Sequence, residues 1–521
     1  MIILRISKAI AVVACLLFGG NSEASPQEGT TPSELQAKAS SQTGIDHLQG
    51  GQAVRRLIDA INSGSEASIA SAVDESFSEA GLSLFMPRDR LITMLVGVQR
   101  HATDLVIREV KSDVEPVTLL VEAQSGRIRM LIRFGPDRQN TDRLAGIGIT
   151  RLIDLAASRL ANERTPDTEA QMVEVIARAI DAQAESGAFN GAVLLTRNGD
   201  VLLARAYGLA NQQLAIANTI DTPFHIGSAG KMLTSVLVNQ FMADGLLSPS
   251  TKVGDIITDY PLADVRNFVT VEQLLTHQAG LGTFFQSPGY DRDKRYVDAT
   301  SEMVVYSAEP LFFPPGSSFR YSNAGFSLLA AMLERISGKS FETLVRERIL
   351  VPAGMSHTYL ASDHPRMRSA ALVYSPIETD PLGFEEPSPL LASDPSAPTD
   401  AVQGFGGGYA SVSDMQKFVN SLITDRLLPR RQYEQMIEKR VEQEAGSQRY
   451  YGYGVMRYTI NGQTMIGNSG AGRFDVRHLV ESGYTLTIAT NHSPPSVTAT
   501  SLPVMDFIAR FASSRDDMTA N

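Results

Sequence analysis

Strand patterns at both ends of a long C-terminal region constrain the fold of this chain more than any other feature of its sequence. Apolar and alternating runs occupy 192–206 near the start of that region and 455–490 near its end. They are interrupted by dipeptides that favour hairpin turns, namely Asn198-Gly199, Asn461-Gly462 and Ser482-Gly483. The stretch between them, 222–448, is mostly helix and loop by pattern. These features predict an α+β domain over 168–515, in which an antiparallel sheet is flanked by helices and carries an inserted helical lobe.

A smaller α+β domain is predicted ahead of it, because 521 residues exceed one ordinary domain. Helical spacing at Val54, Leu57 and Ile61 is followed by strand patterns, of which 128–134 alternates most regularly. The order of elements over 51–162, helices and then a strand meander, resembles the nuclear transport factor 2-like (NTF2-like) fold. This likeness rests on element order and carries no motif.

The N-terminus has the pattern of a secretory signal peptide over 1–24. Arg5 and Lys8 precede an apolar run at 9–20, and small residues follow it. A membrane-spanning helix needs about 20 apolar residues, which this run does not reach. A lipoprotein signal processed at Cys15 is the alternative. We therefore expect an exported protein, periplasmic or secreted, with no transmembrane segment in the mature chain.

Composition excludes several classes of function. The formal net charge of −11 provides no basic surface for a nucleic acid backbone. Cys15 is the only cysteine, so cleavage of the signal peptide leaves no disulfide, thiol nucleophile or thiolate metal ligand. The eight histidines form no pair at metal-ligand spacing, and the sequence predicts no metal and no cofactor. Residues 25–50, rich in Ser, Gln, Thr and Gly, predict a flexible linker before the first domain.

A serine and a lysine three residues apart are the first candidates for chemistry. Helical apolar spacing starts at Met232, so we expect Ser228 in the first turn with Lys231 on the same face. Unpaired N–H groups at a helix start favour an oxyanion beside them. Burial lowers the pKa of a lysine, which can then act as a base. The pair alone is weak evidence, since 9 lysines and 48 serines give about one Ser-x-x-Lys by chance.

A second motif gives this pair its weight. Tyr321-Ser322-Asn323 is the only Tyr-x-Asn in the chain, and it follows a Pro-Pro-Gly loop. A tyrosine near a cation can pass a proton to a leaving group. An asparagine can hydrogen-bond both a lysine and a substrate carbonyl. With the sheet pattern, the two motifs resemble the serine β-lactamase and penicillin-binding protein superfamily, in its class C-type branch, over 170–515. Further runs that fit this branch are Leu274–Leu281, Gly406–Ser411 and Tyr451–Gly454.

The resemblance implies a role for each residue of the two motifs. Ser228 would be the nucleophile that forms an acyl-enzyme, and Lys231 would be its base. Tyr321 would be the partner acid or base, and Asn323 would position the substrate. His277, which lies within the first of the further runs, is structural by the same resemblance.

The third motif of the superfamily departs from its pattern here. The superfamily has a cation or histidine, then a small hydroxyl residue, then a glycine; here Asn468 stands at the first position, while Ser469 and Gly470 fit the other two, and these residues with Ala471 would bind or position the substrate. The N–H of the following Ala471, together with that of Ser228, would form the oxyanion hole. An asparagine cannot neutralise a carboxylate. Because β-lactams and peptides ending in D-alanine carry one, the departure favours uncharged substrates.

Two classes of function remain open from the sequence. The first is a serine hydrolase, foremost an esterase or amidase acting on an uncharged small molecule. Its alternative is a DD-carboxypeptidase or β-lactamase, in which Arg473 would replace the missing cation. The second class is a non-catalytic binding or regulatory module on the same fold, which the altered third motif and the additional domain suggest.

Overall fold

The structure is a computed structural model that describes residues 45–519 with gaps. The residues that the structure does not describe are 1–44, 79–81, 83–86, 103, 113–116, 124–128, 138–139, 153–158, 162, 283–295, 297, 361–368, 375–403, 444–445, 493–495 and 520–521. The predicted signal peptide and most of the predicted linker therefore lie outside the described residues. Described residues up to 152 belong to one compact unit, and those from 159 onward to a second.

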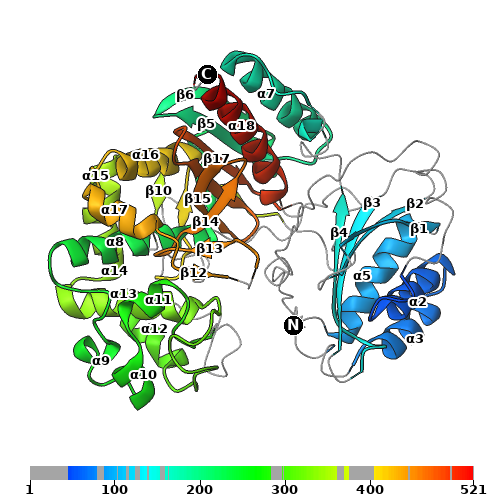
Figure 1. The fold of residues 1–521 in the computed structure, drawn as a ribbon, viewed down its shortest axis with the longest axis horizontal. Helices are drawn as coiled ribbons and strands as arrows, with labels where there is room; N and C mark the ends of the chain where they lie inside the picture. The colour runs from blue at the N-terminus through cyan, green and yellow to red at the C-terminus, as the bar shows by residue number, and fades with distance from the viewer. Residues whose placement is uncertain are drawn as a thin grey trace, which may run out of the picture. The chain divides into compact units, whose positions relative to one another are not determined.

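The first unit combines three helices with a four-stranded antiparallel meander around one apolar core (Figure 1). Its elements are α2 (Gly51–Asn62), α3 (Glu66–Ser76), α5 (Arg88–His101), β1 (Leu105–Ser112), β2 (Val117–Ala123), β3 (Arg129–Pro136) and β4 (Leu144–Leu152). Ile45 is 1% exposed in this core, and the Gly50 N–H donates to the Thr141 carbonyl. Residues 45–50, which the sequence assigned to the linker, therefore contribute to this unit, because the apolar side chain of Ile45 joins its core. The NTF2-like fold stays a prediction.

The second unit is organised by an eight-stranded antiparallel sheet in the order β12-β13-β14-β15-β16-β17-β5-β6. Its strands are β5 (Gly191–Arg197), β6 (Asp200–Tyr207), β12 (Val441–Glu442), β13 (Tyr450–Tyr451), β14 (Met456–Ile460), β15 (Gln463–Gly470), β16 (Phe474–Leu479) and β17 (Tyr484–Thr490). β17 pairs with β5 from Tyr484 opposite Arg197 to Thr490 opposite Gly191. The two ends of the region thus meet in one sheet, and the predicted α+β class is confirmed.

Local turn chemistry explains the hairpins of this sheet. Asn198 and Gly199 have φ of 52° and 94°, and Asn461 and Gly462 have φ of 45° and 77°. Consecutive left-handed residues form the type of turn that matches the twist of paired strands, and Asn-Gly adopts it at low cost. The two predicted Asn-Gly hairpins are therefore present as β5–β6 and β14–β15.

Helices cover both faces of the sheet. α7 (Glu169–Glu185) and α18 (Thr498–Thr519) cover one face, and the helical lobe covers the other (Figure 1). Leu195 packs in one apolar cluster with Ile176 and Ile508 of the first two helices. Its neighbour Leu194 packs in the other cluster with Leu233 of the lobe. Alternate residues of a strand point to opposite faces, so a sheet covered on both sides has apolar residues at both.

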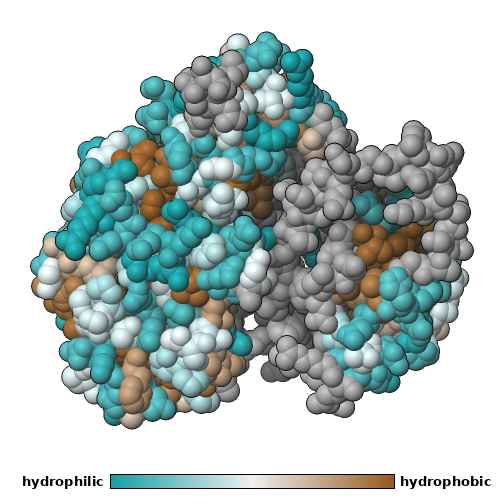
Figure 2. All heavy atoms as spheres, in the orientation of Figure 1, coloured by the Kyte–Doolittle hydropathy of each residue, from teal (hydrophilic) through white to brown (hydrophobic). Residues whose placement is uncertain are grey.

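The lobe and its connections contain the remaining described elements. The helices are η1 (Gly227–Gly230), α8 (Lys231–Ala243), α9 (Val253–Ile256), α10 (Ala263–Phe268), α11 (Val271–Leu275), α12 (Ala299–Tyr306), α13 (Asn323–Ser337), α14 (Phe341–Val345), η3 (Arg346–Leu350), α15 (Val351–Ala353), α16 (Val412–Ile423) and α17 (Arg430–Ile437). The short strands are β7 (Leu209–Asn211), β8 (Ile216–Ala217), β9 (Phe224–His225), β10 (Thr358–Tyr359) and β11 (Tyr409–Ala410). On the face drawn in Figure 2, apolar residues form separate patches in a largely hydrophilic surface. Among the described helices, none combines the length and the apolar content that a bilayer crossing requires.

Candidate active site

Ser228 lies in a short 3-10 turn, η1, which packs against the end of β15. A Cβ added at Gly470 would lie 1.7 Å from the Ile226 carbonyl oxygen, and one added at Gly227 would lie 3.1 Å from the Ala471 backbone nitrogen. Glycine at these two positions therefore lets the turn lie directly on the strand. The prediction placed Ser228 in the first turn of the long helix, whereas α8 begins at Lys231.

Lys231 has no exposed surface, and its amine connects three separate segments. Nζ donates to Ser228 Oγ at 3.2 Å, to Asn323 Oδ1 at 2.7 Å and to the Phe405 carbonyl oxygen at 2.6 Å. Three acceptors match the three protons of an ammonium group. Burial nevertheless holds the pKa of Lys231 well below its ordinary value. A lysine in this environment can release a proton near neutral pH.

Tyr321 approaches the same pair from the loop before α13. Its ring centroid lies 4.7 Å from Lys231 Nζ. Burial raises the pKa of the Tyr321 hydroxyl above its ordinary value, and a hydrogen bond with the Ser228 side chain opposes this rise. The neutral phenol is therefore the resting form at physiological pH. The next residue, Ser322, accepts from the Gly325 N–H and caps α13, which sets Asn323 in its first turn beside the lysine.

A glycine-rich segment forms the opposite side of the serine turn. Gly406, Gly407 and Gly408 have φ of 132°, 82° and 76°, all in the region that favours glycine. The Gly407 N–H donates to the Gly227 carbonyl at 3.1 Å, and the Ile226 N–H donates to the Gly408 carbonyl at 3.0 Å. These bonds hold the segment against η1 and direct the preceding Phe405 carbonyl to Lys231.

Asn468 of the third motif turns inward. It has no exposed surface, and its Nδ2 donates to the Gly454 carbonyl at 3.1 Å while its Oδ1 accepts from the Ser469 N–H at 2.8 Å. Its amide is thus engaged by backbone groups, and its part in substrate binding stays a prediction. Ser469 is partly exposed, and Ala471 follows with a left-handed φ of 51°. The motif thus offers a hydroxyl and a backbone edge rather than a charge.

The sequence did not predict the part of two groups at the site, the Phe405 carbonyl and the His277 ring. The Phe405 carbonyl is a backbone group, so no side-chain pattern could have indicated its bond to the lysine. His277 stands out in the sequence by position, and it lies behind Tyr321 with its ring centroid 4.4 Å from that of the tyrosine. This contact follows from the folded loop and not from any local spacing.

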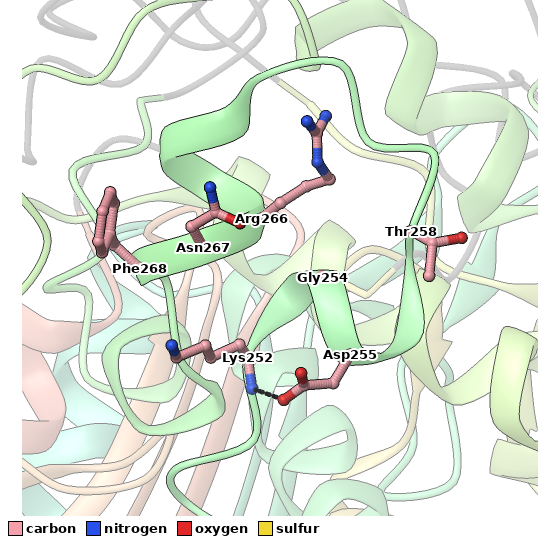
Figure 3. A pocket seen from close by; sticks show the side chains of 7 residues that line it. All are labelled: Lys252, Gly254, Asp255, Thr258, Arg266, Asn267 and Phe268. Carbon is pink, nitrogen blue, oxygen red and sulfur yellow. Dashed lines mark hydrogen bonds between the residues drawn. The ribbon is translucent and has the colours of Figure 1, made fainter.

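A hollow of about 430 Å³ on the helical lobe shares no lining residue with this cluster (Figure 3). It is lined by Lys252, Gly254, Asp255, Thr258, Arg266, Asn267 and Phe268. Arg266 already donates to the carbonyl oxygens of Tyr260 and Pro261. The chemistry-bearing side chains gather at Ser228 instead.

A serine and a lysine three residues apart thus meet a tyrosine from the loop before α13 in one buried cluster. Residues 176–507 match the Beta-lactamase family, which is more than half of the chain. The chain belongs to this family.

Curated relatives include proteins named as penicillin-binding proteins and as D-alanine hydrolases. The putative penicillin-binding protein PbpX of Bacillus subtilis is 26% identical over 268 residues, which are 51% of this chain and 61% of that protein. The teichoic acid D-alanine hydrolase of Staphylococcus aureus is 26% identical over 244 residues, 47% of this chain and 56% of that protein. The chain spans 61% and 56% of the length of these two relatives.

Solved structures share the fold of the second unit. The penicillin binding protein from Bacillus halodurans is 25% identical with a TM-score of 0.53, covering 66% of this chain and 99% of that one. EstCE1, a hydrolase with promiscuous acyltransferase activity, is 20% identical with a TM-score of 0.55, covering 66% and 99%. At that identity the second similarity concerns the fold alone.

Proposed function

We propose that this protein hydrolyses an uncharged ester or amide through an acyl-enzyme on Ser228. The observation that carries the proposal is the contact between Ser228 Oγ and the fully buried amine of Lys231. A neutral amine at this distance takes the serine proton as the oxygen attacks the substrate carbonyl carbon. One acyl–oxygen bond forms at Ser228, and the tetrahedral intermediate carries the negative charge on the former carbonyl oxygen.

The N–H groups of Ser228 and Ala471 are the donors we assign to that oxyanion. Ser228 lies in the first turn of η1, where N–H groups lack helical partners. The Ala471 nitrogen borders the same turn at Gly227. Donors held by a strand end and a helical turn are fixed before the reaction, which is the arrangement that stabilises developing charge most effectively.

Tyr321 is the group we assign to the leaving side. Its neutral phenol contacts Ser228 and lies beside the Lys231 amine, so it can give its proton to the leaving oxygen or nitrogen and be reprotonated from the lysine. The bond between acyl carbon and leaving group then breaks. A water molecule, deprotonated by the same pair, attacks the acyl-enzyme and restores the Ser228 hydroxyl while releasing the acid.

The preference for an uncharged substrate rests on Asn468. A carboxylate-bearing substrate needs a cation at this position of the strand, whereas Asn468 is neutral, buried and bonded to Gly454 and Ser469. An ester or amide without a carboxylate loses no binding interaction when Asn468 stands in place of a cation.

A second candidate, a D-alanyl peptidase or β-lactamase, is favoured by the relatives named penicillin-binding proteins. Arg473, in the turn that follows β15, would then supply the cation. Cephalosporin turnover that disappears in Arg473→Ala but persists in Asn468→Ala would favour this candidate.

Fluorophosphonate labelling followed by peptide mass mapping tests the proposed function. We expect one label on Ser228, its loss in Ser228→Ala, and a parallel loss of p-nitrophenyl ester turnover. Equal turnover in wild type and Ser228→Ala would refute the proposal.

A further inference from the structure

We propose that His277 is a positioning residue that holds Tyr321 at the reaction centre. This inference rests on the proposed function, since it assigns a role in the same proton transfer. His277 does not touch Ser228 or a substrate in the account above; it acts through the loop that carries the tyrosine.

Three contacts run from this one residue to three consecutive residues of the loop. The Arg320 N–H donates to the His277 carbonyl at 2.9 Å, and the Ser322 N–H donates to His277 Nδ1 at 3.1 Å. Between them, the Tyr321 ring lies against the imidazole at 4.4 Å with an interplanar angle of 39°. Backbone on both sides of the tyrosine and the tyrosine ring itself are therefore fixed by a single side chain and its carbonyl.

Aromatic rings surround the buried imidazole of His277. It is 1% exposed, and its centroid lies 5.8 Å from that of Phe319, 5.1 Å from Phe326 and 4.6 Å from Tyr451. Nε2 has no hydrogen-bond partner in the described part of the chain. The polar contact of the imidazole is thus the one to the Tyr321 loop, which a histidine present only to fill space would not need.

The imidazole is neutral, as this contact requires. The pKa of His277 lies well below its ordinary value. Burial is the larger cause of this shift, and the positive charge of Lys231 is the smaller one. A neutral ring that accepts at Nδ1 carries its proton at Nε2. Among the described residues, the titratable groups that face it are Lys231 from α8, Tyr321 from the loop and Tyr451 from β13. Protonation of Nδ1 would remove the acceptor for Ser322 and place a positive charge beside the Lys231 amine.

Neighbouring bonds show that residues 278–282, which follow α11, also support this loop. The Phe312 N–H donates to the Gly280 carbonyl at 2.9 Å, and the Gly316 N–H to the Gln278 carbonyl at 2.8 Å. The Ser322 hydroxyl donates to the Gly282 carbonyl at 2.8 Å. These bonds fix the path of the loop, and the His277 ring adds a contact to the Tyr321 ring.

A double-mutant cycle with Tyr321 separates positioning from bulk structure. His277→Phe keeps the ring and removes the acceptor, and we expect kcat for a p-nitrophenyl ester to fall about ten-fold or more with KM changed less than about three-fold. In the Tyr321→Phe background the same change should cost less than about two-fold, because the group that His277 positions is already absent. Equal losses in both backgrounds would overturn the proposal.

Two further variants guard against a general folding defect. His277→Asn returns an acceptor to Ser322 and should recover part of the kcat lost in His277→Phe. His478 of β16 is another buried histidine, and its ring is bonded to Thr485 of β17. His478→Phe should leave kcat within about two-fold of wild type. A kcat that falls equally in His277→Asn and His277→Phe would count against the acceptor.

Failure of the proposed hydrolase function can be distinguished from failure of the role of His277. If Ser228→Ala turns over the ester as fast as wild type, the proposed function fails. The role of His277 is then tested by measuring the pKa of the Tyr321 phenol. Difference absorbance during an alkaline titration gives this pKa, with Tyr321→Phe as the reference. A phenol pKa that moves toward its ordinary value in His277→Phe, and less in His277→Asn, supports positioning; no movement in either variant contradicts it.

Discussion

Lys231 Nζ lies 3.2 Å from Ser228 Oγ, and the lysine that reaches it has no exposed surface. The helical spacing of three residues brings the two side chains together, and the Phe405 carbonyl and Asn323 hold the amine in place. Proton transfer across this contact requires a lysine that can become neutral, and burial lowers the pKa of Lys231 in that direction.

Replacing Lys231 by Met should abolish most activity without unfolding the protein. The base is lost, so kcat/KM for a neutral ester should fall about 10²–10⁴-fold. Removing a buried charge stabilises the fold while leaving the Phe405 and Asn323 acceptors unpaired destabilises it, so the unfolding free energy should change by less than about 2 kcal/mol. Steady-state kinetics and urea unfolding check both parts. Turnover within about ten-fold of wild type would exclude Lys231 as the base.

The pH dependence of kcat/KM should show the depressed pKa of Lys231. Below its folded-state pKa the amine is protonated and cannot accept the serine proton, so activity rises as pH rises through that value, which lies well below 10.5. The same depression makes the unfolded chain bind the proton more tightly, so stability rises with pH between the folded and the unfolded pKa. The alkaline limb belongs to Tyr321, whose pKa is raised. An acid limb at or above pH 10.5 would contradict this account.

Substrate charge should matter more than substrate size. p-Nitrophenyl butyrate and p-nitrophenyl hemisuccinate have acyl chains of equal length, and the second ends in a carboxylate. Because Asn468 supplies no charge, we expect kcat/KM to be at least about ten-fold higher for the butyrate, which corresponds to about 1.4 kcal/mol. Parallel initial-rate measurements suffice, and faster hydrolysis of the hemisuccinate would point to an unrecognised cation such as Arg473.

Gly470→Ala should disturb the serine turn directly. The added Cβ would lie 1.7 Å from the Ile226 carbonyl oxygen, so η1 and the end of β15 must separate. We expect kcat to fall about ten-fold or more and the unfolding free energy to fall by about 1–3 kcal/mol. Gly146→Ala is the matched control, since nothing lies within 4 Å of its added Cβ and its backbone needs no special conformation. Unchanged kcat in Gly470→Ala would show that the oxyanion donors lie elsewhere.

The sequence predicted those features that local chemistry determines. Asn198-Gly199 and Asn461-Gly462 specify their turns through residues that tolerate positive φ, and the hairpins follow. The pairing of β17 with β5 joins strands from opposite ends of the domain, and no local pattern encodes it. The sheet was predicted from its hairpins, while its strand order required the fold.

The candidate site divides in the same way. Ser228 and Lys231 are neighbours on a helical turn, so their contact was predictable from spacing. The inward turn of Asn468 was not, because strand periodicity gives the face of a side chain but not its hydrogen-bond partner. His277 was interpreted as structural, and only the folded loop shows that its ring, its Nδ1 and its carbonyl all meet the residues around Tyr321.

The covalent intermediate itself is the most direct test of the account. Wild-type protein mixed with a p-nitrophenyl ester and quenched in acid within milliseconds should show by mass spectrometry one added acyl group, and peptide mapping should place it on Ser228. Tyr321→Phe should accumulate more of this species if deacylation uses the same pair. An acyl group on another residue, or turnover of the ester with no acylated protein in wild type or in Tyr321→Phe, would contradict the proposal that Ser228 is the nucleophile.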